Sequence, residues 1–256
     1  MDLLDLFTRM YTAELFNYTL FATIGFVIFY VLFKKKWSYK KIQLRQPKNK
    51  DFYREIGYSL LTLVFFTFVG ILITHSPLYD YTMIYEDINE MPMWYYFLTF
   101  PIMAILHDTY FYWMHRTMHH PKIFKYVHLV HHKSTNPSPW AAYAFHPIEA
   151  IFEAAIFPIM VFILPLHLSA VGFFFLFQIA YNVYGHLGYE LYPKGFNKHW
   201  LGKWINTSIH HNLHHKHFDN SYGLYFTFWD RMMGTMAPQY DETFDEVKTR
   251  EAEAVA

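Results

Sequence analysis

The chain of 256 residues contains no cysteine. It therefore forms no disulfide, no thiolate-ligated iron–sulfur cluster or haem, and no cysteine-based zinc site. Charge is also scarce: Asp, Glu, Lys and Arg make up 16% of the residues, and the formal net charge is zero. No long-range field then favours nucleic acid as a partner. What the chain has instead is 54% hydrophobic and 22% aromatic residues, which is too apolar for a soluble domain of this length.

Long apolar runs predict an all-α integral membrane protein with about four to five membrane-embedded helices. Residues 15–33 and 56–74 carry no charge, and each run is long enough to cross roughly 30 Å of hydrocarbon. A third span is expected to begin at residue 93 and to emerge near Arg116. The apolar block of residues 148–184 is interrupted at 165–167, which predicts an out-and-back hairpin.

The distribution of charges predicts the orientation in the membrane. Lys34, Lys35 and Lys36 follow the first run, whereas residues 80–90 contain four acidic residues and no Lys or Arg. Basic loops stay on the cytoplasmic side, so the N-terminus is expected outside. A signal peptide carries its positive charge before the apolar run, so the first run is interpreted as an uncleaved anchor. The expected location is a bacterial inner membrane or an ER-like membrane.

The same pattern predicts three parts of the chain. Residues 1–92 form an N-terminal membrane anchor of two spanning helices and a loop. Residues 93–240 form a second part, which contains the remaining membrane-embedded helices and a cytosolic helical cap. Residues 241–256 form a charged C-terminal tail that is expected to fray.

Seventeen histidines are far more than ordinary usage, and most of them fall in a few windows. The main groups are His115 and His119; His128, His131 and His132; and His211, His214 and His215. Both triplets are spaced i, i+3 and i+4, which predicts that all three imidazoles of each leave one face of a helix. Imidazole is the commonest protein metal ligand. Eight or more imidazoles are too many for one four-coordinate zinc, so we expect two metal ions. Iron, zinc and copper all accept nitrogen ligands.

Further residues are candidates around these groups. His119 is the ligand if its helix persists, whereas His120 replaces it if the helix unwinds before Pro121. His186 and His146 are also candidate ligands, since each borders an apolar block on the expected cytoplasmic side. Four residues are expected to support the ligands from behind: His107, Asp108, Asn182 and His210. Four acids are expected to tune the site: Asp108, Glu149, Glu190 and Asp230. No catalytic residue is expected beyond the metal centre itself.

Four motifs carry a resemblance to a known family. They are H-R-T-M-H-H-P from His115, H-L-V-H-H from His128, H-H-N-L-H-H from His210, and the ending W-D-R-M-M-G-T from Trp229. Together these motifs resemble the fatty acid hydroxylase/sterol desaturase superfamily, over about residues 95–236, and most of all its bacterial sterol desaturase-like branch. In this resemblance His186 matches an additional histidine ligand. Asn182 stands where some relatives have one more histidine, which leaves His146 to complete the set.

The resemblance implies a membrane-bound non-haem di-iron oxygenase. Residues 93–240 would be its fatty acid hydroxylase-like catalytic domain, with the polyhistidine site for two metals in the cytosolic helical cap. Such an enzyme uses two iron ions, O2 and external electrons to hydroxylate or desaturate an unactivated C–H position of a lipid, here a sterol or isoprenoid or a fatty acyl chain. Zinc is an alternative metal in purified protein. The implied electron donor is a separate cytochrome b5-like protein, ferredoxin or rubredoxin. Nucleic acid is not an expected partner, and a homodimer is left open.

Two other classes of membrane protein are also rich in histidine, but their patterns differ from that of this chain. A histidine-rich membrane metal-binding or transport protein without oxygenase activity would carry its ionisable ligands along a path near the bilayer midplane. A bis-haem cytochrome would pair single histidines from two spanning helices, which does not suit adjacent H-H triplets. The expected clustering of the histidines at one face favours the oxygenase.

Overall fold

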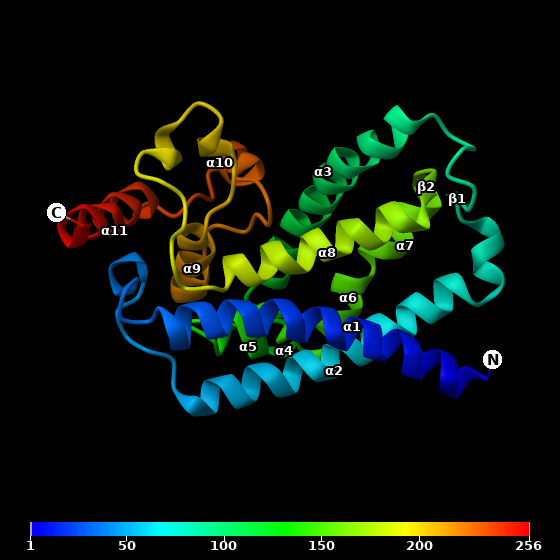
Figure 1. The fold of residues 1–256 in the computed structure, drawn as a ribbon, viewed down its shortest axis with the longest axis horizontal. Helices are drawn as coiled ribbons and strands as arrows, with labels where there is room; N and C mark the ends of the chain where they lie inside the picture. Colours follow the sequence, from blue (N-terminus) through cyan, green and yellow to red (C-terminus); the bar gives the residue numbers. More distant parts are fainter. Residues whose placement is uncertain (1, 256) are drawn as a thin grey trace.

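The computed structural model describes residues 2–255, with side-chain surroundings through residue 250. Long helices run lengthwise through the molecule, and the two termini lie at opposite ends (Figure 1). The α-helices are α1 (Leu3–Phe26), α2 (Asn49–Thr74), α3 (Met93–Met118), α4 (Phe124–Val127), α5 (Leu129–His132), α6 (Pro147–Ala154), α7 (Ile156–Ile163), α8 (Leu168–Gly185), α9 (Ser208–His217), α10 (Phe228–Met233) and α11 (Tyr240–Val255). The shorter elements are the π-helix η1 (Val27–Leu32), the 3-10 helices η2 (Ser38–Lys40), η3 (Pro77–Tyr81), η4 (Pro139–Tyr143), η5 (Phe196–Lys198) and η6 (Gly202–Trp204), and the strands β1 (Ile84–Tyr85) and β2 (Leu166–His167).

Three helices among the described residues are long and apolar enough to cross a membrane: Leu3–Leu32, Asn49–Thr74 and Leu168–Gly185. The first begins at Leu3 rather than at residue 15, because the Asp2 side chain caps it by accepting the N–H of Asp5 at 2.7 Å. The second ends at residue 74, as predicted. Helix α3 is as long as α2, but His107, Asp108 and Arg116 lower its hydropathy. The expected all-α membrane protein is confirmed.

The predicted hairpin is present, although its first limb consists of two helices. Pro158 has no N–H to donate to the Ala154 carbonyl, so α6 ends there, while the N–H of Ile159 bonds the Ala155 carbonyl at 3.2 Å and α7 continues. At the turn, β2 pairs in parallel with β1, with Ile84 opposite Leu166. The hairpin is therefore tied to the loop that follows α2.

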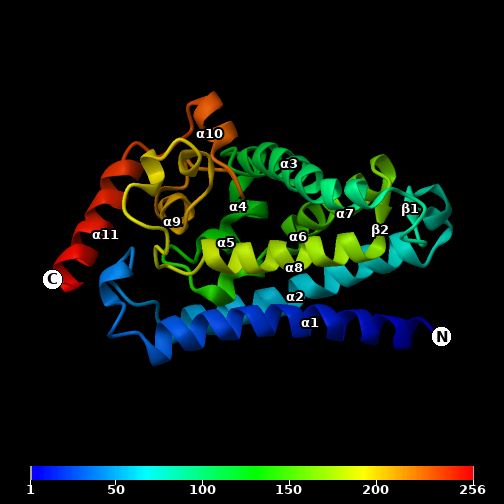
Figure 2. The same ribbon diagram turned by 45° about the horizontal axis from the view of Figure 1, so that its top comes forward.

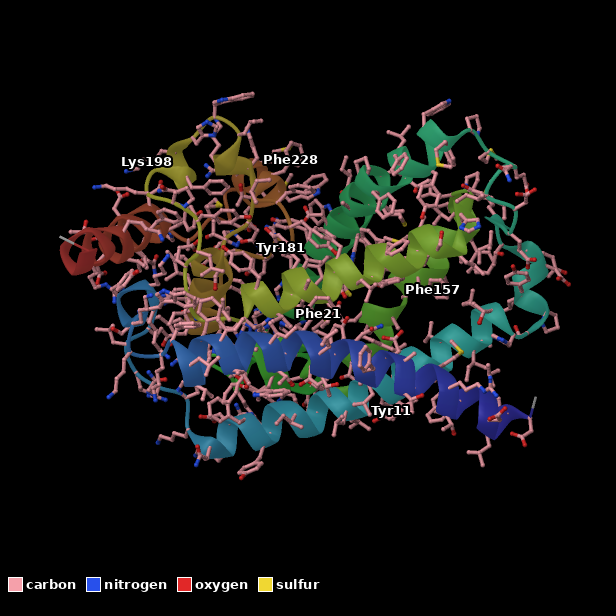
Figure 3. All side chains as sticks on the ribbon, in the orientation of Figure 1. Tyr11, Phe21, Phe157, Tyr181, Lys198 and Phe228 are labelled. Atoms are coloured by element: carbon pink, nitrogen blue, oxygen red, sulfur yellow. The ribbon has the colours of Figure 1, made fainter. Side chains whose placement is uncertain are left out.

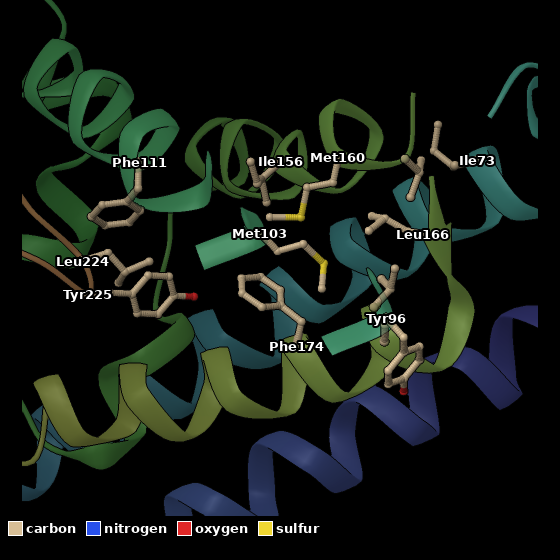
Figure 4. Close-up of a cluster of buried hydrophobic side chains, with 13 residues drawn as sticks. Ile73, Tyr96, Met103, Phe111, Ile156, Met160, Leu166, Phe174, Leu224 and Tyr225 are labelled. Carbon is tan, nitrogen blue, oxygen red and sulfur yellow. The ribbon is translucent and has the colours of Figure 1, made fainter. Parts of the chain in front are cut away.

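The helices pack in layers around α8. Helix α8 lies between α3 on one side and α1 with α2 on the other, in both views of the fold (Figures 1 and 2). Met103 and Phe111 of α3 meet Met160 of α7 and Phe174 of α8 in a buried apolar cluster (Figure 4). Within a bilayer such packing gains mainly dispersion energy, because lipid tails are as apolar as the side chains.

The last part of the chain, residues 186–255, forms a cap at the end of the bundle opposite the N-terminus (Figure 1). Lys198 and Phe228, labelled in Figure 3, both belong to this cap. The prediction of a frayed tail is wrong, because α11 packs Phe244 and Val247 against Ile209 and Leu213 of α9. Tyr240, Phe244 and Val247 are spaced i, i+4 and i+7, so they form an apolar stripe on an otherwise charged helix. Burying each such side chain stabilises the cap by about 1.5–3 kcal/mol.

Candidate metal centre

Nine imidazoles gather in two groups. In each group, one nitrogen from every histidine lies within 4.8 Å of all the others. The first group is His115, His119, His128, His132 and His214, and the second is His131, His186, His211 and His215. The ligand candidates come from α3, the α4–α5 segment, the end of α8, and α9. These segments are far apart in the sequence, so the two groups depend on the tertiary fold.

Each histidine triplet is divided between the two groups. In α9, the i and i+4 residues His211 and His215 join the second group, whereas His214 joins the first. The α4–α5 segment reverses this assignment, since only its i+3 residue, His131, joins the second group. The prediction of one common face is therefore wrong in this detail. At 100° per residue, i and i+4 differ by about 40°, but i+3 lies about 100° from i+4 and points to a different centre.

Nitrogen–nitrogen distances in the second group match the edges of a metal coordination sphere. The Nε2 atom of His186 lies 3.0 Å from that of His211 and 3.2 Å from that of His215, and the last two are 3.1 Å apart. Bonds of about 2.0–2.1 Å to one ion place neighbouring nitrogens roughly 2.9 Å apart in octahedral and roughly 3.3 Å apart in tetrahedral coordination. In the first group, Nε2 of His115 lies 2.9 Å from Nε2 of His128.

The opposite ring nitrogens fix which way these imidazoles point. Nδ1 of His115 donates to the Tyr222 carbonyl at 2.9 Å, and Nδ1 of His186 to the Asn182 carbonyl at 2.8 Å. Nδ1 of His214 donates to the Asn220 carbonyl at 2.7 Å. A carbonyl oxygen only accepts, so the proton sits on Nδ1 and the Nε2 lone pair faces the group. This is the arrangement that metal-ligating histidines commonly show.

His128 differs from these ligand candidates, because its Nδ1 meets a carboxylate. Oε1 of Glu149 lies 2.6 Å from this nitrogen, and both side chains are buried. A carboxylate behind a ligating histidine raises its basicity and fixes its ring. Of the acids expected to tune the site, Glu149 is the one in direct contact with a ligand candidate.

Burial keeps three of the imidazoles that have been placed in the two groups neutral. Burial first, and then the neighbouring imidazoles, holds the pKa of His132, His214 and His215 well below its usual range. Several ring nitrogens are also buried without any hydrogen-bond partner, among them Nε2 of His214 and both nitrogens of His132. Buried polar atoms are ordinarily satisfied, and a metal ion would satisfy these. The donor set therefore fits metal ions.

Of the two alternatives His119 and His120, the structure places His119 with the other imidazoles of the first group. Helix α3 ends at Met118, and the His119 ring lies 4.7 Å, between centroids, from the rings of His128, His132 and His214. His120 is exposed, and its Nδ1 accepts the N–H of Lys122 at 3.3 Å. The structure does not bring His120 into either group.

His146 also lies outside both groups. Its Nδ1 accepts the N–H of Ile148 at 3.3 Å and so caps the N-terminus of α6. The Pro147 that follows occupies the first helical position, where no N–H is needed. His146 thus positions the helix that carries Glu149. The fourth member of the second group is His131, whose Nε2 lies 3.3 Å from that of His186.

The four residues expected to support the ligands have different roles. Asn182 acts through its backbone carbonyl on His186, while its side chain donates to the Ala142 carbonyl at 2.8 Å. His107 contacts no ligand candidate; its Nδ1 lies 3.0 Å from the Tyr225 hydroxyl. Asp108 and His210 belong to the network that holds the loop after α9.

Buried acids hold the loop that follows α9. Oδ1 of Asp108 accepts three backbone N–H groups, those of residues 224, 225 and 226, at 2.7–3.2 Å. Asp230 accepts the N–H groups of Tyr222 and Gly223 and lies 3.2 Å from Nε2 of His210. Burial alone would raise the pKa of Asp230, but the hydrogen bonds from His210, Thr235 and the Tyr222 amide hold it below its usual range.

Glu190 performs the same task at the start of α9. Its carboxylate accepts the N–H groups of Ile209 and Tyr192 and the hydroxyl of Tyr184, at 2.9–3.1 Å. Sequence reasoning missed the carbonyls of Tyr222 and Asn220 as partners of the ligand candidates. No side-chain signal could have revealed them, because a backbone carbonyl is present at every residue.

The fatty acid hydroxylase family model matches residues 100–235, more than half of the chain. The chain therefore belongs to the fatty acid hydroxylase family, and it is a membrane-bound oxidoreductase of the fatty acid hydroxylase/sterol desaturase superfamily. The family match includes every histidine of the two groups. No solved structure matches the chain.

Curated relatives give the same family assignment. A Delta(7)-sterol 5(6)-desaturase of Gibberella zeae is 29% identical over 94% of this chain and 72% of its own length. A probable Delta(7)-sterol 5(6)-desaturase of Neurospora crassa is 30% identical over 96% of this chain and 67% of its own length. The human lathosterol oxidase is 32% identical over 71% of this chain, and the alignment covers 60% of that protein.

Proposed function

We propose that this chain hydroxylates or desaturates an unactivated C–H position of a membrane lipid, a sterol or isoprenoid or a fatty acyl chain, with two iron ions and O2. The observation that carries the proposal is the pair of adjoining buried histidine groups. The sterol-acting relatives favour a sterol-like substrate.

The first ion would be held by His115, His119, His128, His132 and His214, and the second by His131, His186, His211 and His215. Iron accepts imidazole ligands, and zinc competes for the same donors. When bound, the two ions supply the reductive activation of O2 that oxidation of an unactivated C–H position requires. His120 and His146 are not among the proposed ligands.

The chain's own residues orient the donors and exclude water. Backbone carbonyls keep the proton of His115, His186 and His214 on Nδ1, so these imidazoles stay neutral donors. The ring of Phe145 packs on that of His131, with centroids 5.1 Å apart. Phe145 also lines a cavity of about 290 Å³ between the helices. One aromatic layer thus separates the second group from the cavity in which a lipid would lie.

We also propose an orientation of the chain in the membrane and the class of its electron donor. Lys34, Lys35 and Lys36 follow η1 at the end of the bundle that carries the cap, which supports a cytoplasmic metal centre and an outside N-terminus. Electrons would come from a separate cytochrome b5-like protein, ferredoxin or rubredoxin. A homodimer is compatible with the exposed apolar helices.

We further propose that the chain has three parts: a membrane anchor (1–92), a catalytic domain (93–240) and a charged C-terminal segment (241–256). The start of the family match at residue 100 supports the first boundary. Metal transport has less support, since the ligand candidates gather at one end of the bundle instead of along a path.

Anaerobic loading tests the proposal. Purified protein loaded with ferrous iron is expected to bind two ions per chain and, with a chemical or protein reductant and O2, to oxidise a sterol presented in lipid vesicles. Zinc-loaded protein is the matched control and should leave the sterol unchanged. The same assay would be repeated with an isoprenoid and with a fatty acyl lipid. If protein with two bound iron ions gave no O2-dependent product from the sterol, the isoprenoid or the fatty acyl lipid, the enzymatic assignment would be contradicted.

A further inference from the structure

The cavity between the helices contains an unusual set of polar groups. Its walls come mainly from the candidate membrane spans α1, α2 and α8 together with α6 and α7, so a ligand would enter it from the bilayer. Helix α8 lines it from Leu168 to Ile179, about 16 Å of helix at 1.5 Å per residue. Most lining side chains are apolar, yet Glu14 of α1 and Glu153 of α6 also face this space.

The two carboxyl groups have no partner in the fold. Neither Glu14 nor Glu153 forms a hydrogen bond or ion pair with a described residue, although Glu153 is only 9% exposed. Among the lining residues that the structure describes, none is Lys or Arg. A polar group that is shut away from water without a partner costs free energy, so a ligand that fills this cavity would have to supply partners for both carboxyl groups.

Tyr143 lines the same cavity as Glu14 and Glu153. Its ring stacks on that of Tyr18, with centroids 5.9 Å apart, and its hydroxyl donates to Oε1 of Gln178 at 2.7 Å. Burial first, and then the charges of Glu14 and Glu153, raises the pKa of the Tyr143 hydroxyl. Tyr143, Gln178 and the two acids all line the cavity. Together the four side chains form one polar site in an apolar cavity.

This polar site lies beside the metal centre. Glu153 is one helical turn beyond Glu149, so these two residues are about 6 Å apart along α6. Glu149 in turn contacts His128 of the first histidine group. Phe145, on the same wall, packs on His131. A polar group bound at Glu153 would therefore place the adjoining apolar part of the same molecule near the histidine groups.

We propose that Glu14, Glu153 and the Tyr143–Gln178 pair bind the hydroxyl group of an uncharged lipid alcohol and exclude lipids with an anionic head group. A hydroxyl donates to a carboxyl oxygen and accepts from a neighbouring donor, so it satisfies the unpartnered groups. A carboxylate, sulfate or phosphate would meet two acid groups and no Lys or Arg among the described lining residues, so its charge would stay uncompensated in a low-dielectric cavity. The inference rests on the proposed function only in that it takes the lipid alcohol to be the substrate.

Competition binding tests the site without catalysis. Full-length protein, both metal-free and iron-loaded, would be saturated with tritiated cholesterol and competed with unlabelled cholesterol, cholesteryl methyl ether and cholesterol sulfate. We expect cholesterol to compete at least about tenfold better than either analogue, because a buried hydrogen-bonding group left without its partner costs about that factor. A wild-type protein that does not prefer cholesterol to both analogues would overturn the proposal.

Variants then test the residues. Glu14→Leu/Glu153→Leu should abolish the preference for the alcohol over both analogues. Glu14→Gln/Glu153→Gln keeps acceptors of the same shape, so it should keep the preference over the ether. It also adds amide N–H donors for an anion, so it should weaken the exclusion of the sulfate. Glu90→Gln, in an exposed loop, is the matched control. Unchanged competition in the leucine and glutamine variants would overturn the role of these acids, and the glutamine pair decides the matter if the leucine pair does not fold.

The outcomes separate this inference from the proposed function. Preferential binding of cholesterol without any oxidised product would leave the lipid-alcohol site standing and contradict the oxygenase. Oxidation of sterol sulfates as readily as of the free alcohol would support the oxygenase and overturn the site.

Discussion

Glu149 and His128 are joined by a hydrogen bond of 2.6 Å inside the protein, and neither side chain is more than 2% exposed. The imidazole comes from the junction between α4 and α5, and the carboxylate from α6. The bond therefore fixes a proposed metal ligand to the hairpin that also lines the cavity. Loss of this hydrogen bond should weaken metal binding more than it destabilises the fold.

Glu149→Gln should weaken metal binding at the first histidine group. The amide no longer supports the basicity of His128, and loss of such a partner typically lowers metal affinity 10–100-fold. Competition of ferrous iron against a chelator would measure this change. Glu90→Gln, which is exposed, is the control. Equal affinities in Glu149→Gln and wild-type protein would show that the carboxylate has no influence on the site.

His214→Ala and His131→Ala should each remove one metal ion, and the two ions should be different ones. His214 belongs to the first group and His131 to the second. At saturating ferrous iron, each variant should bind about one ion per chain, and neither should oxidise lipid. His75→Ala, at the exposed end of α2, should retain both ions. Retention of two ions by either test variant would disprove the assignment of that histidine.

His120→Ala should bind two metal ions and retain its activity. His120 is exposed and its ring does not reach either group. His146→Ala should also bind two ions, but removal of the cap on α6 should lower the free energy of unfolding by about 1 kcal/mol. Metal analysis of both variants would check this. Loss of one ion in either would return that residue to the ligand set.

Asp108→Ala should destabilise the protein by on the order of 3 kcal/mol, because three buried backbone N–H groups lose their acceptor. Asp108→Asn keeps a carbonyl oxygen at the same place, so its loss should be smaller. Thermal unfolding in detergent would compare the two variants. If Asp108→Ala unfolds at the wild-type temperature, Asp108 does not hold the loop of residues 224–226.

Lys41 should make stability rise with pH in alkaline solution. Burial first, and then the charge of Lys34, lowers the pKa of the Lys41 ammonium from its ordinary 10.5 to about 8. Between these two values the unfolded chain binds a proton that the folded chain has released, so raising the pH favours the fold. One proton corresponds to at most about 1.4 kcal/mol per pH unit.

Lys41→Met should remove this contribution to the slope of unfolding free energy against pH between pH 8 and 10. The exposed Lys50→Met is the control and should leave the slope as in wild type. A slope that Lys41→Met does not reduce would contradict the lowered pKa.

Sequence patterns predicted the helices, the hairpin and the histidines, because apolar runs and i, i+4 spacings are local properties of the chain. The division of each triplet between two groups was not predicted. It depends on the break between α4 and α5 at His128 and on the angle at which α9 meets that segment, and both are set by tertiary packing.

Other misses also have physical causes. His146 was expected as a ligand because it borders the hairpin, but a histidine next to a helix start can equally cap it, and its Nδ1 does so. Helix α11 was expected to fray because its charges conceal the stripe of Tyr240, Phe244 and Val247. Recognising that stripe requires knowing that α9 offers it a partner surface.

The division of each H-x-x-H-H triplet has a mechanical consequence. Because α9 contributes histidines to both groups, as the α4–α5 segment does, neither element can shift without disturbing both groups. An ion bound by one group would therefore immobilise backbone on which the other group also depends. The second ion then finds its donors already arranged, so loading should be cooperative, and partially filled protein should be scarce during titration.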